Sequence, residues 1–165
     1  FSDYNNLVRD FFHYVKFSNQ EHLLSFVSGL LSNIETDQFK YFDYWVPVPY
    51  HQSRLRKRGF NVLELLFLAF FEKCGVPQLN LFDRKINTEP LFDKTIDQRK
   101  KILQEAFSFK IEPSIITNKK ILLVDDIVTT GSTIRECLTL LSQTKFTDIA
   151  VMSYAKVLNF NESIS

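Results

Sequence analysis

The hydrophobic pattern along the chain predicts helices that alternate with short strands. Residues 4–34 carry apolar side chains at helical spacing, and Ser18 or Asn19 can cap the second half of this stretch. A further apolar helix is expected over 61–74, because Gly75 follows it and glycine commonly ends helices. Short runs rich in apolar residues predict strands at 43–48, 79–84, 119–127 and 148–157.

The C-terminal part of the chain has the pattern of a strand–helix–strand unit. The strand at 119–127 is apolar without alternation, which is typical of a strand buried on both faces of a parallel sheet. A helix is expected at 131–143 and a parallel strand at 148–157, so the pattern predicts an α/β protein. Residues 85–110 are polar and charged, with a weak helical pattern at 97–106, and we expect a mobile segment there.

Length and composition agree with one folded domain. The 165 residues include 45% hydrophobic residues, enough for a substantial core. The formal net charge is only +1, so any contact with nucleic acid must come from local basic patches. Cys74 and Cys137 have no metal-binding or disulfide spacing, and we expect two buried thiols in a reducing cytoplasm. No apolar run approaches the roughly 20 residues needed to span a bilayer, so we expect a cytoplasmic protein without membrane insertion.

A pair of carboxylates followed by a hydroxyl-rich loop is the strongest chemical feature of the sequence. Asp125 and Asp126 end the strand at 119–127, and residues 129–133 lead directly into the next helix. A helix N-terminus offers unpaired N–H groups to a phosphate, and Gly131 lets the backbone approach closely. The adjacent acids suit the vicinal hydroxyls of a ribose, so the stretch indicates a ribose 5-phosphate site. The alternative is that these residues are ordinary helix caps.

A basic segment lies between the first strand and the apolar helix. Residues 50–61 are expected to form a loop broken by Gly59, with four basic residues at 54–58 and no acidic residue. Such a cluster repels itself unless an anion visits, although a solvated basic loop remains the alternative. Phe60 can stack on a base, or it can anchor the next helix in the core.

Two stretches resemble those of a known family. "ILLVDDIVTTGST" resembles the phosphoribosyl pyrophosphate (PRPP) binding motif of type I phosphoribosyltransferases. "VPVPYHQSRLRKRGFN" resembles the PVP…RGFN segment of the ComF family, phosphoribosyltransferase-like proteins linked to bacterial competence. The resemblance implies a type I phosphoribosyltransferase fold, with a central, mostly parallel sheet flanked by helices and a mobile hood. It also implies a single domain over 1–165, with a helical N-terminal part at 1–42 and a PRPP-binding core at 43–165.

The resemblance implies a role for each part of these motifs. Asp125 and Asp126 would accept hydrogen bonds from the ribose hydroxyls, and as residues of a strand end outside the core they could both become Asn without loss of the fold. The remainder of the ribose and phosphate site would be Ile127, Val128, Thr129, Thr130, Gly131, Ser132 and Thr133. The loop facing the pyrophosphate would contribute Pro49, Tyr50, His51, Arg54 and Arg58. Mg²⁺ would be held through PRPP, with no direct protein ligand.

Three functions remain open from the sequence. The first is a competence factor that binds PRPP with Mg²⁺ and single-stranded DNA during DNA uptake, together with other competence or DNA-processing proteins. The second is an active phosphoribosyltransferase, although no carboxylate stands at Thr129 to act as a general base. The third is a PRPP-sensing regulator without catalysis. The candidate DNA-binding residues are Arg56, Lys57, Phe60, Arg99, Lys100 and Lys101.

Overall fold

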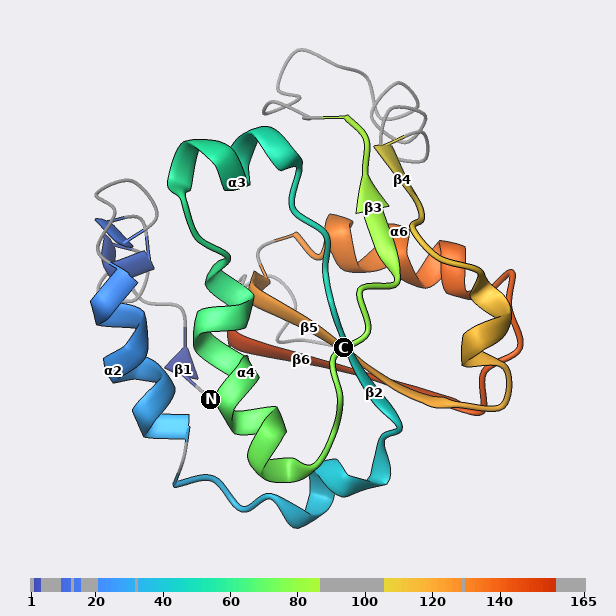
Figure 1. The fold of residues 1–165 in the computed structure, drawn as a ribbon, viewed down its shortest axis with the longest axis horizontal. Helices are drawn as coiled ribbons and strands as arrows, with labels where there is room; N and C mark the ends of the chain where they lie inside the picture. Colours follow the sequence, from blue (N-terminus) through green and yellow to red (C-terminus); the bar gives the residue numbers. More distant parts are fainter. Residues whose placement is uncertain are drawn as a thin grey trace, which may run out of the picture.

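A four-stranded parallel sheet forms the centre of the molecule (Figure 1). The computed structural model describes residues 2–3, 10–12, 14–15, 21–31, 33–86, 106–128 and 130–156. The sheet has the order β1-β6-β5-β2, and every neighbouring pair of strands is parallel. Its strands are β1 (Ser2–Asp3), β2 (Tyr44–Pro47), β5 (Lys120–Val128) and β6 (Asp148–Lys156). The predicted α/β class and parallel sheet are therefore confirmed.

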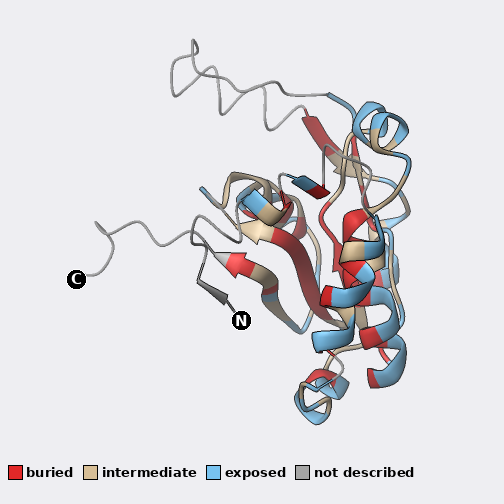
Figure 2. Cartoon of the chain, turned by 90° about the vertical axis from the view of Figure 1, so that its left-hand side faces the viewer, coloured by how far each residue is buried: buried red, intermediate tan, exposed pale blue. Residues whose placement is uncertain are grey.

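Helices cover both faces of this sheet. Helices α2 (Glu21–Leu31) and α4 (Val62–Cys74) lie together on one face, and α6 (Ser132–Leu141) lies on the other (Figures 1 and 2). Figure 2 shows the buried residues gathered in the sheet and on the sides of the helices that face it. The structure also contains a short helix, α3 (Gln52–Arg58), and two 3₁₀ turns, η1 (Asp37–Tyr41) and η2 (Pro113–Ile116).

Helix α4 confirms the predicted apolar helix and its end signals. Asn61 caps its start, since the Leu63 N–H donates to Asn61 Oδ1 at 3.1 Å. Gly75 ends it with φ +71°, a left-handed conformation that glycine adopts without steric cost. Trp45 of β2 stacks on Phe71 of α4 with ring centroids 5.0 Å apart, and both are fully buried. This contact fixes the helix against the strand that leads into the basic segment.

Strand β5 confirms the predicted buried strand. It runs between β2 and β6, and its residues 121–124 are all buried. Val124 is the partner of Pro47 on one side and of Met152 on the other. A continuous apolar run is what such a position requires, because both faces of the sheet are covered.

A second, antiparallel sheet of two strands lies beside α6 (Figure 1). It pairs β3 (Phe82–Arg84) with β4 (Phe107–Phe109). The sequence predicted a strand at 79–84 but no partner for it within 85–110. The predicted weak helix at 97–106 lies outside the described residues except for its last residue.

The predicted loop at 50–61 is wrong, because most of it forms α3. His51 caps this helix, with the Ser53 N–H donating to His51 Nδ1 at 3.2 Å. Arg56 Nη2 donates to Gln52 Oε1 one turn earlier at 3.0 Å. Gly59 ends the helix with φ +83°, so the predicted break at this position is confirmed. Arginine, lysine, glutamine and leucine are good helix formers, and the charge pattern concealed that preference.

The N-terminal region combines a strand with helices. Residues 10–12 and 14–15 are helical, as is α2, in agreement with the predicted helices. The predicted caps Ser18 and Asn19 lie outside the described residues. Strand β1 was not predicted, because a two-residue strand carries no periodicity; it pairs with β6 at Ser2–Ala155 and Asp3–Lys156.

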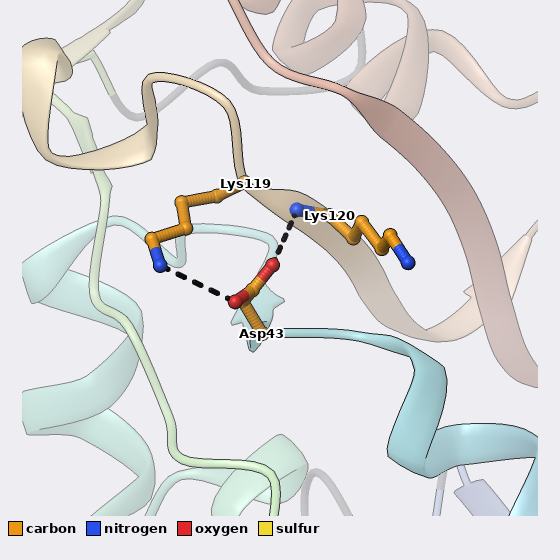
Figure 3. Close-up of polar contacts among 3 residues, drawn as sticks. All are labelled: Asp43, Lys119 and Lys120. Atoms are coloured by element: carbon orange, nitrogen blue, oxygen red, sulfur yellow. Dashed lines mark hydrogen bonds and ion pairs between the residues drawn. The ribbon is translucent and has the colours of Figure 1, made fainter.

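Asp43 joins the starts of β2 and β5 (Figure 3). Its Oδ2 accepts the Lys120 N–H at 2.8 Å, and its Oδ1 accepts a hydrogen bond from Lys119 Nζ at 3.3 Å. The Asp43 N–H also donates to the Lys120 carbonyl at 2.9 Å. The hydrogen bond from the Lys120 amide lowers the pKa of Asp43, with a smaller contribution from Lys119, while partial burial opposes both.

Replacing Asp43 by Ala is expected to lower the free energy of unfolding by about 1 kcal/mol at neutral pH, the usual contribution of one such hydrogen bond. Because the folded-state pKa lies below the value of 3.8 expected for an unfolded aspartate, this contribution is present above that pH. It is lost as the pH falls through the folded pKa. Urea denaturation of both proteins over this range measures it. Asp37→Ala is the control, since Asp37 pairs with Lys40 on the exposed surface. If the free energies of unfolding of the wild-type chain and Asp43→Ala differ by the same amount at pH 7 and at pH 2, the assignment is contradicted.

Candidate functional site

The two adjacent acids lie in β5 itself, near its carboxyl end. Asp125 is 9% exposed and Asp126 is 4% exposed. Asp125 pairs with Ser153 of β6, and strand pairing continues to Val128. The expectation that both acids lie outside the core is therefore wrong, because the strand extends beyond them and neighbouring segments cover them. Buried carboxylates are costly unless donors surround them, so their position requires partners.

Hydrogen bonds from two backbone amides and from Tyr50 hold the acid pair in place. Asp125 Oδ1 accepts the Asp126 N–H at 2.9 Å, and Asp126 Oδ1 accepts the Ile127 N–H at 2.7 Å. The hydroxyl of Tyr50 donates to Asp126 Oδ2 at 2.9 Å. Burial raises the pKa of Tyr50 well above its usual value, and the charges of Asp126 and Asp125 raise it further. Tyr50 therefore keeps its proton and acts as a donor to Asp126.

The described residues of the loop after β5 lead directly into α6. Gly131 adopts φ +68° and immediately precedes α6. Among the described residues, a Cβ atom there would meet a Val128 methyl at 3.9 Å, an ordinary contact, so backbone conformation rather than space requires glycine. Thr130 is exposed, and its Oγ1 accepts the Ser132 N–H at 3.4 Å. Thr133 follows in the first turn of α6, partly exposed. The predicted site residue Thr129 lies outside the described residues.

Arg135 of α6 donates hydrogen bonds to the backbone of this loop. Its guanidinium Nη2 donates to the carbonyl of Thr130, and its N–H donates to the Gly131 carbonyl at 2.9 Å. The N–H groups at the start of α6 are thus presented next to the carboxyl end of β5. A helix N-terminus in this position attracts an anionic group.

The predicted pyrophosphate loop begins where β2 ends. The Val48 N–H donates to the Val124 carbonyl at 2.9 Å, so pairing with β5 extends one residue beyond β2. Pro49 and Tyr50 follow, and Tyr50 turns its hydroxyl to the acid pair, a contact that the predicted pyrophosphate role did not include. His51 lies within 3.2 Å of the Lys85 carbonyl through Nε2, which links the start of α3 to the end of β3.

Arg84 on β3 is a candidate site residue that the sequence analysis did not assign. It is 9% exposed, and its guanidinium lies over the Phe107 ring at 5.1 Å. Burial lowers its pKa, the positive charge of Arg54 lowers it further, and the negative charge of Asp125 acts in the opposite direction. Arg84 is thus electrostatically coupled both to a basic residue of α3 and to the acid pair. The alternation along Phe82–Arg84, which puts Arg84 on the same buried side of the strand as Phe82, was the available signal in the sequence.

A pocket of about 380 Å³ lies between the start of α3 and the end of β3. It is lined by His51, Gln52, Ser53, Arg56, Asp83, Arg84 and Lys85. Three of these residues carry a positive charge and one a negative charge. The volume falls in the range of small-molecule sites, and the excess of basic groups suits an anion.

The predicted basic residues of α3 take different positions. Arg58 lies over the ring of Tyr50, with its Cζ 5.6 Å from the ring centroid. Arg54 is exposed and close enough to Arg84 to influence its pKa. Arg56 and Lys57 are exposed on the same helix.

The remaining candidates for DNA binding differ in how far the structure describes them. Phe60 is partly buried and packs against the core, as an anchor of the following helix would. Arg99, Lys100 and Lys101 lie outside the described residues.

Other sequence expectations concern the cysteines, metals and the membrane. Cys74 and Cys137 are both buried and unpaired, which confirms the burial expected for the two thiols, and burial raises the pKa of each thiol. Among the described ranges, no three His, Cys, Asp or Glu side chains gather into a group that could hold a metal ion. No helix in the described part of the chain has both the length and the apolar character needed to cross a membrane.

Comparisons with known proteins agree with the family resemblance. A family model described as "Phosphoribosyl transferase domain" matches residues 76–156. Competence protein F of Haemophilus influenzae is 30% identical over 73% of this chain and 53% of its own length. Competence protein ComFC of Streptococcus pneumoniae is 30% identical over 93% of this chain and 65% of its own length. The chain thus spans between about half and two thirds of the length of these relatives.

A solved hypoxanthine phosphoribosyltransferase of Staphylococcus aureus is 14% identical, with a TM-score of 0.46, over 83% of this chain and 65% of that chain. The fold class does not depend on this likeness. It rests on the strand order of the sheet and on the family model. Together with the two competence proteins, these findings confirm the resemblance carried by the two sequence motifs. The chain is similar to the ComF competence proteins over most of its own length, and it has a type I phosphoribosyltransferase-like fold.

Proposed function

We propose that this chain is a competence factor that binds PRPP with Mg²⁺ and also binds single-stranded DNA, in support of DNA uptake during natural transformation. The names of both relatives, competence proteins, support the biological role. The phosphoribosyltransferase domain match supports the choice of a sugar phosphate as ligand.

The single observation that carries the ligand proposal is the buried acid pair beside an exposed loop and helix start. Asp125 and Asp126 concentrate negative charge where a phosphate alone would be repelled. Sugar hydroxyls are donors and satisfy carboxylates, while the phosphate of the same molecule reaches the N–H groups at the start of α6. A ribose 5-phosphate meets both requirements at once.

The pyrophosphate of PRPP is assigned to the basic side of the site. Arg54 and Arg84 have like charges that disfavour one another, and an anion between them relieves that repulsion. The pocket at the start of α3 adds Lys85 to this basic group. Arginine is suited to this task because its planar guanidinium binds two phosphate oxygens together.

Mg²⁺ is assigned to the ligand rather than to a protein cage. The carboxylates available near the pocket are few, and Mg²⁺ is commonly bound through one or two carboxylates and the phosphates of a substrate. When bound, it neutralises pyrophosphate charge next to the acid pair. The protein's own residues bind the two anionic ends and orient the ribose between them.

DNA binding is assigned to the exposed face of α3. Replacing Arg56 and Lys57 by Gln is expected to weaken binding of a single-stranded oligonucleotide. It should also reduce the slope of log affinity against log salt by about 0.7 for each phosphate that the variant no longer neutralises. Fluorescence anisotropy with a labelled oligonucleotide at several salt concentrations measures both effects. The substitution Lys110→Gln with Lys145→Gln removes the same charge at exposed positions outside α3 and is the matched control.

The outcomes separate the functions. An equal loss of affinity in both double variants shows that net charge, and not α3, governs DNA binding. Absence of DNA binding by the wild-type chain at low salt, with and without Mg²⁺–PRPP, removes the DNA part of the proposal. In that case, pyrophosphate release with a panel of nucleobases distinguishes an enzyme from a sensor.

A further inference from the structure

We propose that the hydroxyl of Tyr50 occupies the place of a ribose hydroxyl on Asp126, and that PRPP must displace it to bind. This inference rests on the proposed ribose site. It gives Tyr50 a role distinct from the pyrophosphate contact expected from its place in the sequence. Tyr50 is then a residue that sets the affinity of the ribose site.

The accessibility of Asp126 is the first observation behind this proposal. Only 4% of the residue is exposed, so a sugar cannot reach its carboxylate in the described arrangement. Both carboxylate oxygens already accept a hydrogen bond, Oδ1 from the Ile127 N–H and Oδ2 from Tyr50. The Ile127 bond belongs to the backbone of β5, whereas the Tyr50 bond belongs to a side chain on a different segment. Tyr50 is therefore a group whose movement opens the acid.

The exchange has a definite energetic sign. In the empty site, Tyr50 satisfies a buried charge, and removing that donor leaves Asp126 poorly solvated. An incoming ribose hydroxyl then restores a missing hydrogen bond instead of replacing an existing one. Without the Tyr50 hydroxyl, the empty site is less stable and the bound site is equally stable, so the affinity for the sugar rises.

Arg58 connects this exchange to the pyrophosphate end of the site. Its guanidinium lies over the ring of Tyr50 at 5.6 Å and holds the ring by a cation–π contact. A pyrophosphate that draws Arg58 toward itself removes this contact. His51, the next residue after Tyr50, caps α3 and reaches Lys85, so movement of Tyr50 is transmitted to the start of α3. PRPP, which carries both ribose and pyrophosphate, is the ligand expected to release Tyr50.

The variant Tyr50→Phe tests the proposal, because it removes only the hydroxyl. Isothermal titration calorimetry with Mg²⁺–PRPP is expected to give an affinity about tenfold higher than that of the wild-type chain, toward the lower end of what a hydrogen bond to a charged group contributes. Tyr41→Phe is the matched control. It removes a hydroxyl that donates to Asp148 Oδ2 at 2.7 Å. Tyr41 precedes β2 and Asp148 begins β6, so this hydrogen bond lies at the end of the sheet away from the acid pair.

The possible results separate this inference from the proposed function. Tighter binding by Tyr50→Phe with no change in Tyr41→Phe supports displacement, because a purely structural role of the hydroxyl would weaken binding. Wild-type binding that is equal to or stronger than that of Tyr50→Phe overturns the inference and leaves the PRPP site standing. If Tyr50→Phe binds Mg²⁺–PRPP and the wild-type chain does not, the inference is supported. If neither of these two proteins binds it, both the inference and the proposed PRPP site are overturned.

Discussion

Replacement of both Asp125 and Asp126 by Asn is expected to lower the affinity for Mg²⁺–PRPP by more than about 100-fold, because the ligand loses two hydrogen bonds to charged acceptors and each contributes about 1.5–3 kcal/mol. An Asn side chain still offers one oxygen, but it is neutral and its nitrogen opposes a ribose hydroxyl that donates. Calorimetric titration of the wild-type and variant chains with Mg²⁺–PRPP measures the change in affinity. Normal affinity in the double variant removes the ribose assignment.

The double variant is expected to fold, although the reason differs from the sequence-based one. Both acids are buried, so their replacement is tolerated only because Asn can take over the local hydrogen bonds. Its Oδ1 can accept the same N–H groups of residues 126 and 127 that the carboxylates accept. Removal of two buried charges also relieves their repulsion. Thermal denaturation checks the fold, and Asp148→Asn at the exposed start of β6 is the matched control for the substitution.

Replacement of Arg84 by Gln is expected to weaken binding of Mg²⁺–PRPP by about tenfold or more, because glutamine cannot form the charge-assisted, bidentate hydrogen bonds that arginine makes to phosphate. The same variant should bind ribose 5-phosphate almost as well as the wild-type chain does, since that ligand lacks the pyrophosphate. The acid-pair variant should have reduced affinity for both ligands. Titrating each protein with each ligand therefore assigns the two ends of the site separately.

Two further variants make the Arg84 result specific. Arg84→Lys keeps the charge and removes the planar fork, so its affinity should fall between those of the wild-type chain and Arg84→Gln. Lys110→Gln removes an exposed positive charge just after β4 and should leave the affinity unchanged. Equal weakening for PRPP and ribose 5-phosphate in Arg84→Gln would show that Arg84 acts on the acid pair or on the fold, not on the pyrophosphate.

The sequence predicted well those elements whose signals are local. Helix α4 carries its cap and its terminating glycine within a few residues of its ends, and β5 carries a continuous apolar run. Such features depend on nearest neighbours and on burial, both of which leave a pattern in the chain. The loop at 130–133 could be placed at the start of a helix for the same reason.

The sequence could not show contacts that depend on how distant segments meet. Tyr50 and Asp126 are 76 positions apart, and only the alignment of β2 with β5 brings them together. Arg84 enters the site because β3 pairs with β4 across the segment between them. Helix α3 was missed because a dense run of basic residues suggested solvent and anions more strongly than helix formation.

A crystal structure of the chain with Mg²⁺–PRPP tests the central claim most directly. We predict the ribose hydroxyls within hydrogen-bond distance of Asp125 and Asp126, and the 5-phosphate on the loop at the start of α6. The pyrophosphate should lie toward Arg84, and Tyr50 should have left Asp126. A sugar bound elsewhere, or bound there with its hydroxyls turned away from both acids, would contradict the claim.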